Sequence, residues 1–337
     1  MSFITNLLDT ALARRQHFFD EEHYAAFRLF NGFYEGFPQL SIDIYARTAL
    51  FHNYAETPID DELNSAVQWL NAQLPWIQCI VCKARSAKSS AEKRATLLYG
   101  SVPDQKIREA GVWYSIDITM NRDASFYLDT RNVRAWAKTN LRGKTVLNTF
   151  AYTGSLGVAA FAGGAARVIQ LDRNQNFLNL AKDSYALNGF SVKSRDFLST
   201  DFFPGVSQLK KSGQLFDCIF LDPPFFASTA SGRVDLETGS TKLINKIRPL
   251  VRHGGWIIAI NNALFINGKD YLASLQALCA DEYLSIEQLI PVPDDFTGST
   301  PPQLKNSPTD PAPFNHSTKI AVLRVKRKSK YLLTADG

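Results

Sequence analysis

From residue 145 onward, short apolar blocks alternate with segments whose apolar residues recur at helical spacing. The block Phe216–Leu221 is almost continuously apolar, as expected of a strand that is buried on both faces. Strands that alternate with helices form βαβ units, which assemble into a sheet with helices on both faces. This part of the chain is therefore predicted to fold as a doubly wound α/β domain with a seven-stranded sheet.

The predicted strands are short apolar runs bounded by turn residues, and they cover 145–150, 168–171, 191–195, 216–221, 256–260, 285–290 and 319–325. Helical spacing predicts helices over 155–161, 174–187, 236–250 and 271–279. Gly254 and Gly255 are predicted to punctuate the chain before the fifth strand. Between the last two strands, residues 291–317 are rich in Pro, Ser, Thr and Asn. A loop of that length inside a compact domain is expected to be functional or disordered.

The first 120 residues have a different pattern, which predicts a small α+β domain. Residues 3–31 carry apolar residues at helix-like intervals and are predicted to be helical. A helix is also predicted from Asp60 to Leu74, capped by Asp60 or Asp61 and stopped by Pro75. Short β-type runs cover 40–45, 49–54, 77–83 and 113–118. The predicted domains are thus 1–120 and 121–330.

The composition limits the classes of protein to which the chain can belong. Its 337 residues are 45% hydrophobic and 20% charged, which suffices to bury a full core. No stretch approaches the roughly 20 apolar residues that span a bilayer, and residues 1–20 do not resemble a secretory signal. Four cysteines are too few for a disulfide framework in a chain of this length. These features predict a soluble, cytoplasmic protein.

The formal charge of +5 is compatible with a polyanionic partner, although many enzymes without such a partner have a similar charge. Basic residues gather in two segments, 83–94 and 324–330. The first fits a phosphate-contacting loop as well as a solvated one, and the second is better interpreted as a solvated terminal segment. The five histidines show no metal-ligand spacing, so no metal site is predicted.

The first turn of the α/β domain carries the strongest functional signal. Residues 146–155 (VLNTFAYTGS) place Gly154 at the end of a parallel strand, where a backbone without a side chain lets a ligand approach closely. Asp172 ends the second strand and can accept the hydroxyls of a ribose. Asp196, after the third strand, can meet an adenine amino group or simply be a solvated loop acid. Any doubly wound domain can carry a glycine turn and an acid at these places.

The spacing of the glycines in this turn restricts the ligand. Gly154 and Gly157 do not form the G-x-G-x-x-G pattern that cradles a pyrophosphate. The turn therefore argues against NAD or FAD and favours a ligand without phosphates, such as S-adenosylmethionine.

The second functional signal is the segment 222–226 (DPPFF), which directly follows the fourth strand. Two consecutive prolines stiffen the backbone and remove hydrogen-bond donors, so that nearby carbonyls become fixed acceptors. A carboxylate next to such a carbonyl can hold an exocyclic amino group or align a ring nitrogen, and an adjacent aromatic ring can stack on a base. The alternative is a plain strand-ending turn with two buried phenylalanines.

From about residue 20 to residue 326, the chain resembles the bacterial large-subunit ribosomal RNA methyltransferases of the RlmI and RlmK type. The segments that carry the resemblance in the first part of the chain are 21–24 (EEHY), 28–32 (RLFNG) and 37–43 (FPQLSID). Those in the second part are 125–131 (SFYLDTR), 150–155 (FAYTGS), Asp172 and 222–226. The match covers most of the chain, and its motifs occur in the family's order.

This resemblance implies a Rossmann-like methyltransferase that uses S-adenosylmethionine. Arg131 would pair with the carboxylate of the cofactor, for which a guanidinium is well suited, although it also fits a surface arginine at a helix end. The resemblance implies that the catalytic residues are Asp222, Pro223 and Phe225. It implies that the cofactor-binding residues are Phe126, Tyr127, Asp129, Arg131, Asn148, Phe150, Ala151, Tyr152, Thr153, Gly154, Ser155, Asp172, Arg173, Asp196, Phe197 and Asp222.

The chain departs from the family pattern in three places. It has no room for the RNA-binding PUA module that precedes the small domain in some members, and it lacks the family's basic residue after the segment 222–226. Members that methylate carbon 5 of cytosine need a cysteine nucleophile near the end of the fifth strand. Here that segment is 260–263 (INNA), which resembles the guanine-modifying branch. Its cysteines (Cys79, Cys82, Cys218 and Cys279) lie elsewhere and are interpreted as structural.

The predicted function is S-adenosylmethionine-dependent methylation of a base nitrogen in RNA, with ribosomal RNA as the expected partner and guanine favoured over carbon 5 of cytosine. The small domain would contact the RNA. Two alternatives stay open. One is a methyltransferase of a small molecule or a protein on the same scaffold, and the other is a non-catalytic RNA-binding factor.

Overall fold

The computed structural model describes residues 2–86, 95–120, 124–229, 232–297 and 309–327. The chain divides into two compact units. The small unit comprises Met1–Leu128 and Pro293–Asn306, and the large unit comprises Asp129–Val292 and Ser307–Gly337. Within the described residues, no helix is long and apolar enough to cross a membrane.

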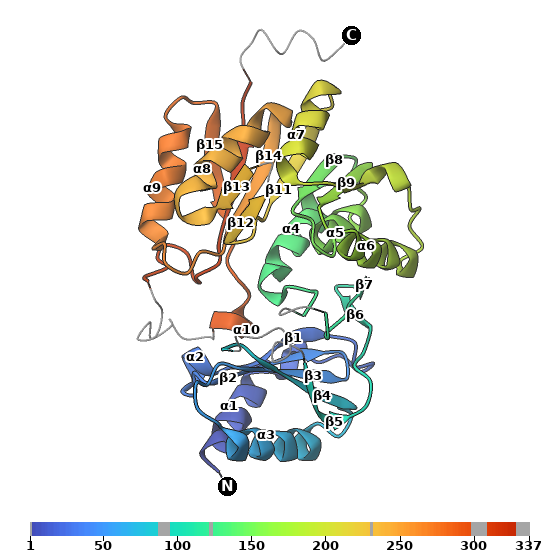
Figure 1. Ribbon diagram of the computed structural model, residues 1–337, viewed down its shortest axis with the longest axis vertical. Coiled ribbons are helices and arrows are strands. Elements are labelled where there is room, and N and C mark those ends of the chain that lie inside the picture. Colours follow the sequence, from blue (N-terminus) through green and yellow to red (C-terminus); the bar gives the residue numbers. More distant parts are fainter. Residues whose placement is uncertain (1, 87–94, 121–123, 230–231, 298–308, 328–337) are drawn as a thin grey trace. The chain divides into compact units, whose positions relative to one another are not determined.

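The large unit is built on a seven-stranded sheet with the strand order β10-β9-β8-β11-β14-β16-β15 (Figure 1). The pairs from β10 to β14 are parallel, whereas β16 is antiparallel to both of its neighbours. The strands are β8 (Thr145–Thr149), β9 (Arg167–Asp172), β10 (Phe197–Ser199), β11 (Phe216–Leu221), β14 (Val251–Asn261), β15 (Leu284–Leu289) and β16 (Lys319–Val325). The predicted doubly wound α/β fold is confirmed.

Helices cover both faces of this sheet, because side chains alternate between the faces along each strand. Leu147, Ile219 and Ile257 point to the face that packs against α7 (Phe202–Lys211), α8 (Leu236–Ile247) and α9 (Gly268–Cys279). The helices α4 (Arg131–Asn140), α5 (Ser155–Ala162) and α6 (Gln175–Leu187) form the second helical group, in which α5 packs on β8 and β9. A short hairpin of β12 (Phe226–Thr229) and β13 (Gly232–Asp235) follows β11.

The structure corrects two predictions in the large unit. The third strand is not 191–195 but β10, because a 3₁₀ turn occupies Ser194–Asp196 and pairing with β9 begins only at Phe197. Gly254 and Gly255 do not interrupt the chain but lie inside β14. The pairing of β11 with β14 shifts register at this point, and Gly254 has a φ of 71°, so the glycines allow a bulge within a continuous strand.

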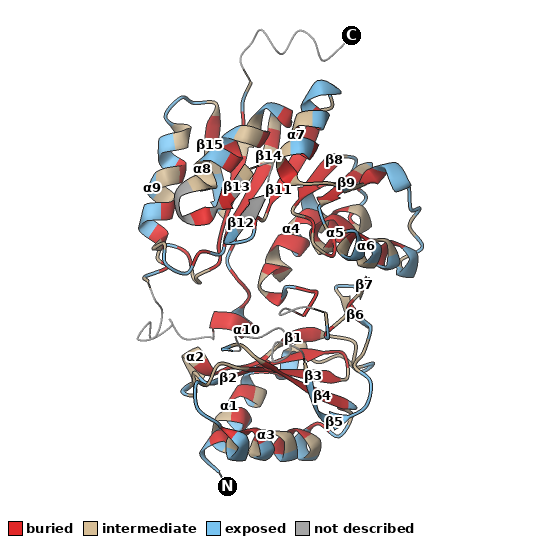
Figure 2. Ribbon diagram, in the orientation of Figure 1, coloured by how far each residue is buried: buried red, intermediate tan, exposed pale blue. Residues whose placement is uncertain are grey.

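The small unit is built on a five-stranded sheet with the order β1-β2-β3-β4-β5. Helices α1 (Phe3–Arg15) and α3 (Asp60–Gln73) enclose a core on one face with residues such as Leu8, Phe27 and Phe51. Figure 2 shows most strand residues of this sheet as buried. The strands are β1 (Ala26–Asn31), β2 (Leu40–Tyr45), β3 (Thr48–Asn53), β4 (Cys79–Ala84) and β5 (Thr96–Gly100). The remaining elements are α2 (Gly32–Glu35), α10 (Asp294–Thr297) and the hairpin of β6 (Lys106–Glu109) and β7 (Val112–Ser115).

The predicted helix over residues 3–31 is wrong in its second half. The chain leaves the helical conformation after η1 (Gln16–Phe18), and Ala26–Asn31 forms β1, antiparallel to β2. A register shift between Arg28 and Phe30 lets Leu29 and Phe30, although adjacent in sequence, both reach the core. This apolar spacing imitates a helix, and only the pairing with β2 distinguishes the two. The helix predicted from Asp60 is confirmed, although Ile59, rather than Asp60 or Asp61, occupies the cap position.

The second face of the small sheet carries a cluster of polar side chains that are largely buried. Arg28 on β1 donates from Nε and Nη2 to the carboxylate of Asp43 on β2 at 2.7 and 3.1 Å. His52 on β3 places Nε2 2.8 Å from Oδ2 of the same carboxylate, the oxygen that also accepts from Nη2 of Arg28. Burial alone would raise the pKa of Asp43, but the charge of Arg28 and the hydrogen bond of His52 outweigh it and hold that pKa below its usual range.

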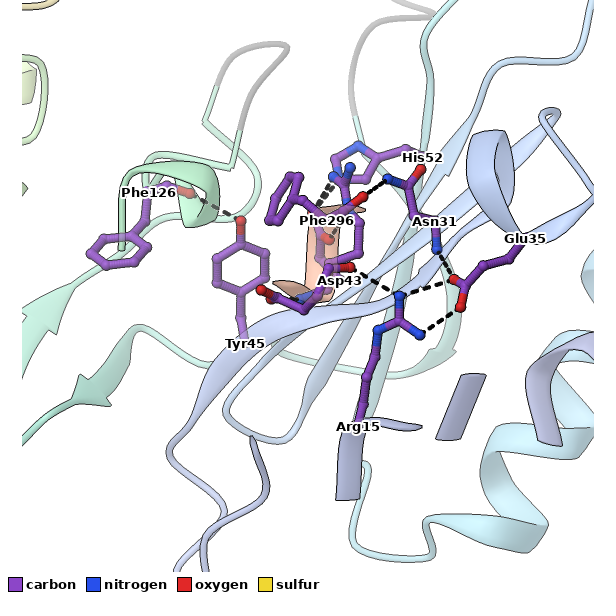
Figure 3. Close-up of polar contacts among 10 residues, drawn as sticks. Arg15, Asn31, Glu35, Asp43, Tyr45, His52, Phe126 and Phe296 are labelled. Carbon is purple, nitrogen blue, oxygen red and sulfur yellow. Dashed lines mark hydrogen bonds and ion pairs between the residues drawn. The ribbon is translucent and has the colours of Figure 1, made fainter. Parts of the chain in front are cut away.

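A segment from the far end of the chain completes this face. In α10, the carboxylate of Asp295 accepts the backbone N–H of Arg28 at 2.8 Å, and its carbonyl accepts from the guanidinium of Arg15 at 2.9 Å. The side chain of Asn31 donates to the carbonyl of Phe296 at 2.6 Å. Figure 3 shows Arg15 between this segment and the carboxylate of Glu35. Residues about 270 positions apart in sequence therefore share one hydrogen-bonded layer.

The polar face predicts an acid-sensitive stability. Burial lowers the pKa of His52, and Nδ1 has no partner among the described residues, so a second ring proton would be buried without an acceptor. The unfolded chain binds this proton more readily, as it does the proton of Asp43. The free energy of unfolding should therefore be greatest above about pH 6.5 and should fall as the pH decreases below it.

The urea midpoint measured between about pH 7.5 and pH 5.5 tests this expectation. His52→Gln should lose less stability over this interval than the wild type. His17→Gln, which changes an exposed histidine of the same unit, should leave the pH dependence unchanged. If the urea midpoint depended on pH equally in the wild type and in His52→Gln, His52 would have the same pKa in the folded and unfolded states, which would contradict the expectation.

Candidate functional site

The candidate site lies at the carboxyl edge of the large sheet. Here β8, β9, β11 and β14 end, and the antiparallel β16 begins, because Asn261 at the end of β14 pairs with Lys319. The chain runs outward from β8 through β9 to β10 and then returns to β11 on the other side of β8. In open α/β sheets, ligands bind outside the carboxyl ends of the strands at such a reversal.

The turn after β8 has an unusual backbone. Phe150, Tyr152 and Gly154 all have left-handed φ values, of 52°, 50° and 77°. Non-glycine residues rarely adopt this conformation, and it persists only where the surroundings enforce it. Here the backbone N–H of Ala151 donates to the carbonyl of Leu171 at 2.9 Å, and that of Gly154 donates to the carbonyl of Ala151 at 2.7 Å. The turn is therefore fixed before any ligand binds.

The carboxylate of Asp172 fastens this turn to the end of β9. One oxygen accepts the backbone N–H of Tyr152 and the other accepts that of Asn174, both at 2.8 Å. Burial raises the pKa of Asp172, and these hydrogen bonds and the charge of Arg173 oppose the rise. Each carboxylate oxygen can accept more than one hydrogen bond. Asp172 holds the turn and keeps capacity for further hydrogen bonds, and its contact with ribose hydroxyls stays a prediction.

Gly154 is required by packing as well as by its φ value. A Cβ at this position would lie 2.6 Å from the Cβ of Ala181 on α6 and 3.1 Å from Nε2 of Gln170. Gln170 was not predicted, although it organises the turn. Its amide accepts from Nδ2 of Asn148 at 2.9 Å and donates to the carbonyl of Gly154 at 3.3 Å. Asn148 is buried and acts on the turn through Gln170.

Asp196 is held by an ion pair within the described structure. Its Oδ1 lies 2.8 Å from Nε and 2.7 Å from Nη2 of Arg167, at the start of β9. Asp196 is buried rather than a solvated loop acid, and Phe197 beside it packs against the ring of Tyr185. A contact of Asp196 with an adenine amino group stays a prediction.

Asp222 follows β11 in the segment 222–226, next to the site of the reversal. Burial raises its pKa to about 7, and the nearby carboxylate of Asp129 contributes to the rise. A carboxyl group with this pKa can exchange a proton near neutral pH. Pro223 is buried, whereas the rings of Phe225 and Phe226 are 40% and 53% exposed. The two phenylalanines are therefore not core residues, and the plain-turn alternative does not describe them.

The start of β16 contributes residues that were not predicted. Thr318 donates from Oγ1 to Oδ2 of Asp129 at 2.8 Å and so orients the neighbour of Asp222. Lys319 is fully buried, and its Nζ donates to the carbonyl of Ala263 at 2.9 Å and to that of Ser317 at 2.6 Å. Burial lowers the pKa of Lys319 to about 8. The only signal in the sequence is a lysine that opens an apolar strand.

The remaining predicted residues occupy distinct places in the structure. Phe126 and Tyr127 belong to the small unit, where the carbonyl of Phe126 accepts from the hydroxyl of Tyr45 at 3.0 Å. Arg131 is the first residue of α4, and Ser155 is the first residue of α5. Thr153 lies in the turn and Arg173 follows β9. Their contacts with a cofactor stay predictions.

The two basic segments are only partly described. Lys83 is buried at the end of β4, with its Nζ 3.4 Å from the carbonyl of Met120, and so does not act as a solvated loop residue. Arg324 is paired with Glu287 on β15 and stacks on Trp256, so it is part of the sheet. Lys88, Lys93, Arg94, Lys328 and Lys330 lie outside the described residues.

The packing beneath the turn predicts the cost of a side chain there. Gly154→Ala should lower the free energy of unfolding by about 1–2 kcal/mol for the left-handed backbone and by about 1–3 kcal/mol more for the contact with Ala181. Gly213→Ala is the matched control, because Gly213 has a φ of 70° but no atom within 4 Å of the added Cβ. Urea unfolding of both variants separates the two costs. Equal destabilisation would contradict the packing argument, and Ala181→Gly should partly restore Gly154→Ala.

Residues 60–304 match the family of S-adenosylmethionine-dependent methyltransferases. Among curated relatives, the ribosomal RNA large subunit methyltransferase I of Photobacterium profundum is 28% identical over 275 residues, which cover 80% of this chain and 68% of that protein. The protein of the same name from Alteromonas mediterranea is 32% identical over 227 residues, which cover 66% of this chain and 57% of that protein. The chain thus spans only part of the length of these relatives.

Solved structures share the fold. A Streptococcus mutans protein described as a methyltransferase dependent on S-adenosylmethionine superposes with a TM-score of 0.82 at 22% identity, covering 96% of this chain and 81% of that one. A methyltransferase in complex with SAH gives a TM-score of 0.83 at the same identity and coverage. These likenesses concern the fold alone. The groups at the turn also fit a ligand with a ribose and no phosphate. Asp172 supplies hydrogen-bond acceptors for ribose hydroxyls, and the turn has no phosphate-binding glycine pattern. The family match spans well over half of the residues, so the chain belongs to the S-adenosylmethionine-dependent methyltransferases.

Proposed function

We propose that this chain transfers a methyl group from S-adenosylmethionine to a nitrogen atom of a base in large-subunit ribosomal RNA, with guanine favoured as the base. The curated relatives are named for activity on large-subunit ribosomal RNA, which supports RNA as the substrate class. The observation that carries the reaction type is the place of Asp222, a carboxyl group directly after β11 that is followed by the exposed ring of Phe225.

Most of the catalytic effect proposed here is positioning. S-adenosylmethionine supplies a methyl group on a sulfonium, which is already a good leaving group. The turn 150–155 and Asp172 would hold the cofactor at the end of β8 and β9. Asp222 in its ionised form would accept an N–H of the base and take up that proton as the nitrogen is methylated, and Phe225 would stack on the base. Thr318 would keep Asp129 oriented beside Asp222.

The cysteines support a nitrogen rather than carbon 5 of cytosine as the acceptor. Methylation of that carbon requires a thiolate that adds covalently to the ring. The segment after β14 contains Asn261, Asn262 and Ala263 instead of a cysteine. Cys218 lies inside β11, where burial raises its pKa well above the usual value, and burial also raises the pKa of Cys79, Cys82 and Cys279. Thiols held in the protonated form are poor nucleophiles.

The direct test is transfer of radiolabelled methyl from S-adenosylmethionine to RNA, protein and small-molecule fractions of cells that lack the gene. Label in ribosomal RNA, followed by nucleoside analysis that finds a methylated guanine nitrogen, would support the proposal. A 5-methylcytosine product would overturn the choice of atom. Label in protein or small molecules would overturn the substrate class. Absence of cofactor binding would overturn the enzymatic function.

Asp222→Asn should reduce the rate far more than it weakens cofactor binding. An amide keeps the shape of the carboxylate but cannot take up a proton or accept with both atoms, and a positioned acid or base contributes about 10²–10⁴-fold. We expect kcat to fall in this range, while the Kd for S-adenosylmethionine from calorimetry changes little. Asp183→Asn, an exposed acid on α6, is the control. Equal losses of rate and binding would show that Asp222 acts on the cofactor.

The rate should rise with pH through the pKa of Asp222. Below about pH 7 the carboxyl group is protonated and cannot accept the N–H of the base, and above it the acceptor form predominates. We expect kcat/KM, measured with RNA and cofactor both below saturation, to increase with a midpoint near 7. The residual activity of Asp222→Asn should lack this step. A rate that instead falls through pH 7 would mean that Asp222 donates a proton.

A further inference from the structure

The loop between β14 and α9, residues 262–267, presents two large apolar side chains to solvent. Leu264 is 48% exposed and Phe265 is 66% exposed. They are adjacent in sequence, so together they form a small apolar projection on the surface of the large unit. Adjacent exposed apolar side chains on a rigid element mark a contact with something outside the molecule more often than an isolated one does.

The backbone of this loop is held on several sides. The side-chain oxygen of Asn261 accepts the N–H of Ala263 at 2.9 Å, and Nζ of Lys319 donates to the backbone carbonyl of Ala263 at 2.9 Å. The hydroxyl of Thr309 donates to the carbonyl of Leu264 at 2.8 Å. The N–H of Gly268, just beyond the loop, donates to the carbonyl of Asp310 at 2.8 Å. The projection is therefore presented by a fixed backbone and costs little ordering when it binds.

The exposure of these side chains is not needed to anchor the loop. Ala263 is fully buried, and Ile266 packs against the core of the large unit. These two residues supply the apolar contacts that attach the loop to the fold. Among the described residues, the side chains of Leu264 and Phe265 leave apolar area exposed to water that the attachment of the loop does not require.

The position of the loop 262–267 indicates which kind of molecule Leu264 and Phe265 contact. It begins at the end of β14, and β14 lies beside β11, whose end carries Asp222 and the exposed Phe225. Both loops therefore leave the same edge of the sheet. The segment 262–267 also carries no charge, so it is not built to bind phosphates. A neutral aromatic ring on a loop that leaves the same edge of the sheet as Asp222 suits the face of a nucleobase, because every base offers such a face.

We infer that Phe265, supported by Leu264, is an apolar wedge that fills the place in the RNA stack from which the target base has been drawn toward Asp222. This inference rests on the proposed function. A stacked base that is methylated at a nitrogen must leave its stack to reach the reactive groups, and the unstacking costs a few kcal/mol. A side chain that stacks on the neighbouring base replaces the lost contact.

Phe265→Ala tests the wedge, and Phe3→Ala is the matched control. Phe3 is 65% exposed on α1, so both changes remove the same side chain from an equally exposed place. Phe265→Ala should weaken binding to large-subunit ribosomal RNA from cells lacking the gene by about tenfold, as loss of one stacking contact does. Its Kd for S-adenosylmethionine and its melting temperature should not change. Phe265→Trp should restore the affinity for RNA.

The salt dependence separates the wedge from a phosphate contact. Because Phe265 neutralises no phosphate, the slope of log Kd against log salt should be the same for Phe265→Ala and the wild type. Unchanged RNA affinity in Phe265→Ala, with methyl transfer to RNA intact in the wild type, would overturn the wedge and leave the proposed function in place. A wild type that neither binds nor methylates RNA would overturn both. A lowered melting temperature in Phe265→Ala would show a structural role and overturn the wedge.

Discussion

The carboxylate of Asp172 is the contact on which the candidate site depends. It accepts one N–H from the turn after β8 and one from the start of α6, so a single side chain fixes two neighbouring strand ends relative to each other. Phe150 and Tyr152 are kept in a left-handed conformation that an isolated peptide would avoid. Without this carboxylate, two backbone N–H groups would need new partners, and the turn would lose its left-handed conformation.

In the small unit, the cost of burying charged side chains nearly offsets the stability that their ion pair contributes. Arg28, Asp43 and His52 hold an ion pair that is largely shielded from water, and such an arrangement stabilises a fold little more than apolar residues of the same size would. Loss of one member is costly, however, because the others then stay buried without a partner, at about 3–5 kcal/mol for a broken pair. The layer thus specifies which segment can cover the sheet more than it adds stability. The carbonyls of α10 accept from Arg15 and Asn31, so a covering segment with its acceptors elsewhere would lose these two hydrogen bonds.

Helices and strands can be predicted from the sequence wherever the spacing of apolar residues fits only one kind of secondary structure. The strands β11 and β16 have the predicted bounds, because each apolar run is buried in the middle of the sheet. β1 was missed because a bulged strand and a helix place apolar residues at similar spacings. Asp222 could be found from its motif, but Lys319 could not. A lysine that opens a strand resembles a solvated terminus, and only the register with Asn261 shows that it is buried.

The route of the chain through its two units has a consequence for synthesis on the ribosome. The small unit takes most of its residues from the first part of the chain but also needs Pro293–Asn306. Arg15, Arg28 and Asn31 leave the ribosome long before α10, so their hydrogen-bond partners in that segment arrive last. The strand β16, which closes the large sheet between β14 and β15, begins 22 positions after the end of α10. Both units are therefore completed by the same final stretch of chain, and a contiguous fragment that ends before residue 293 contains neither of them whole.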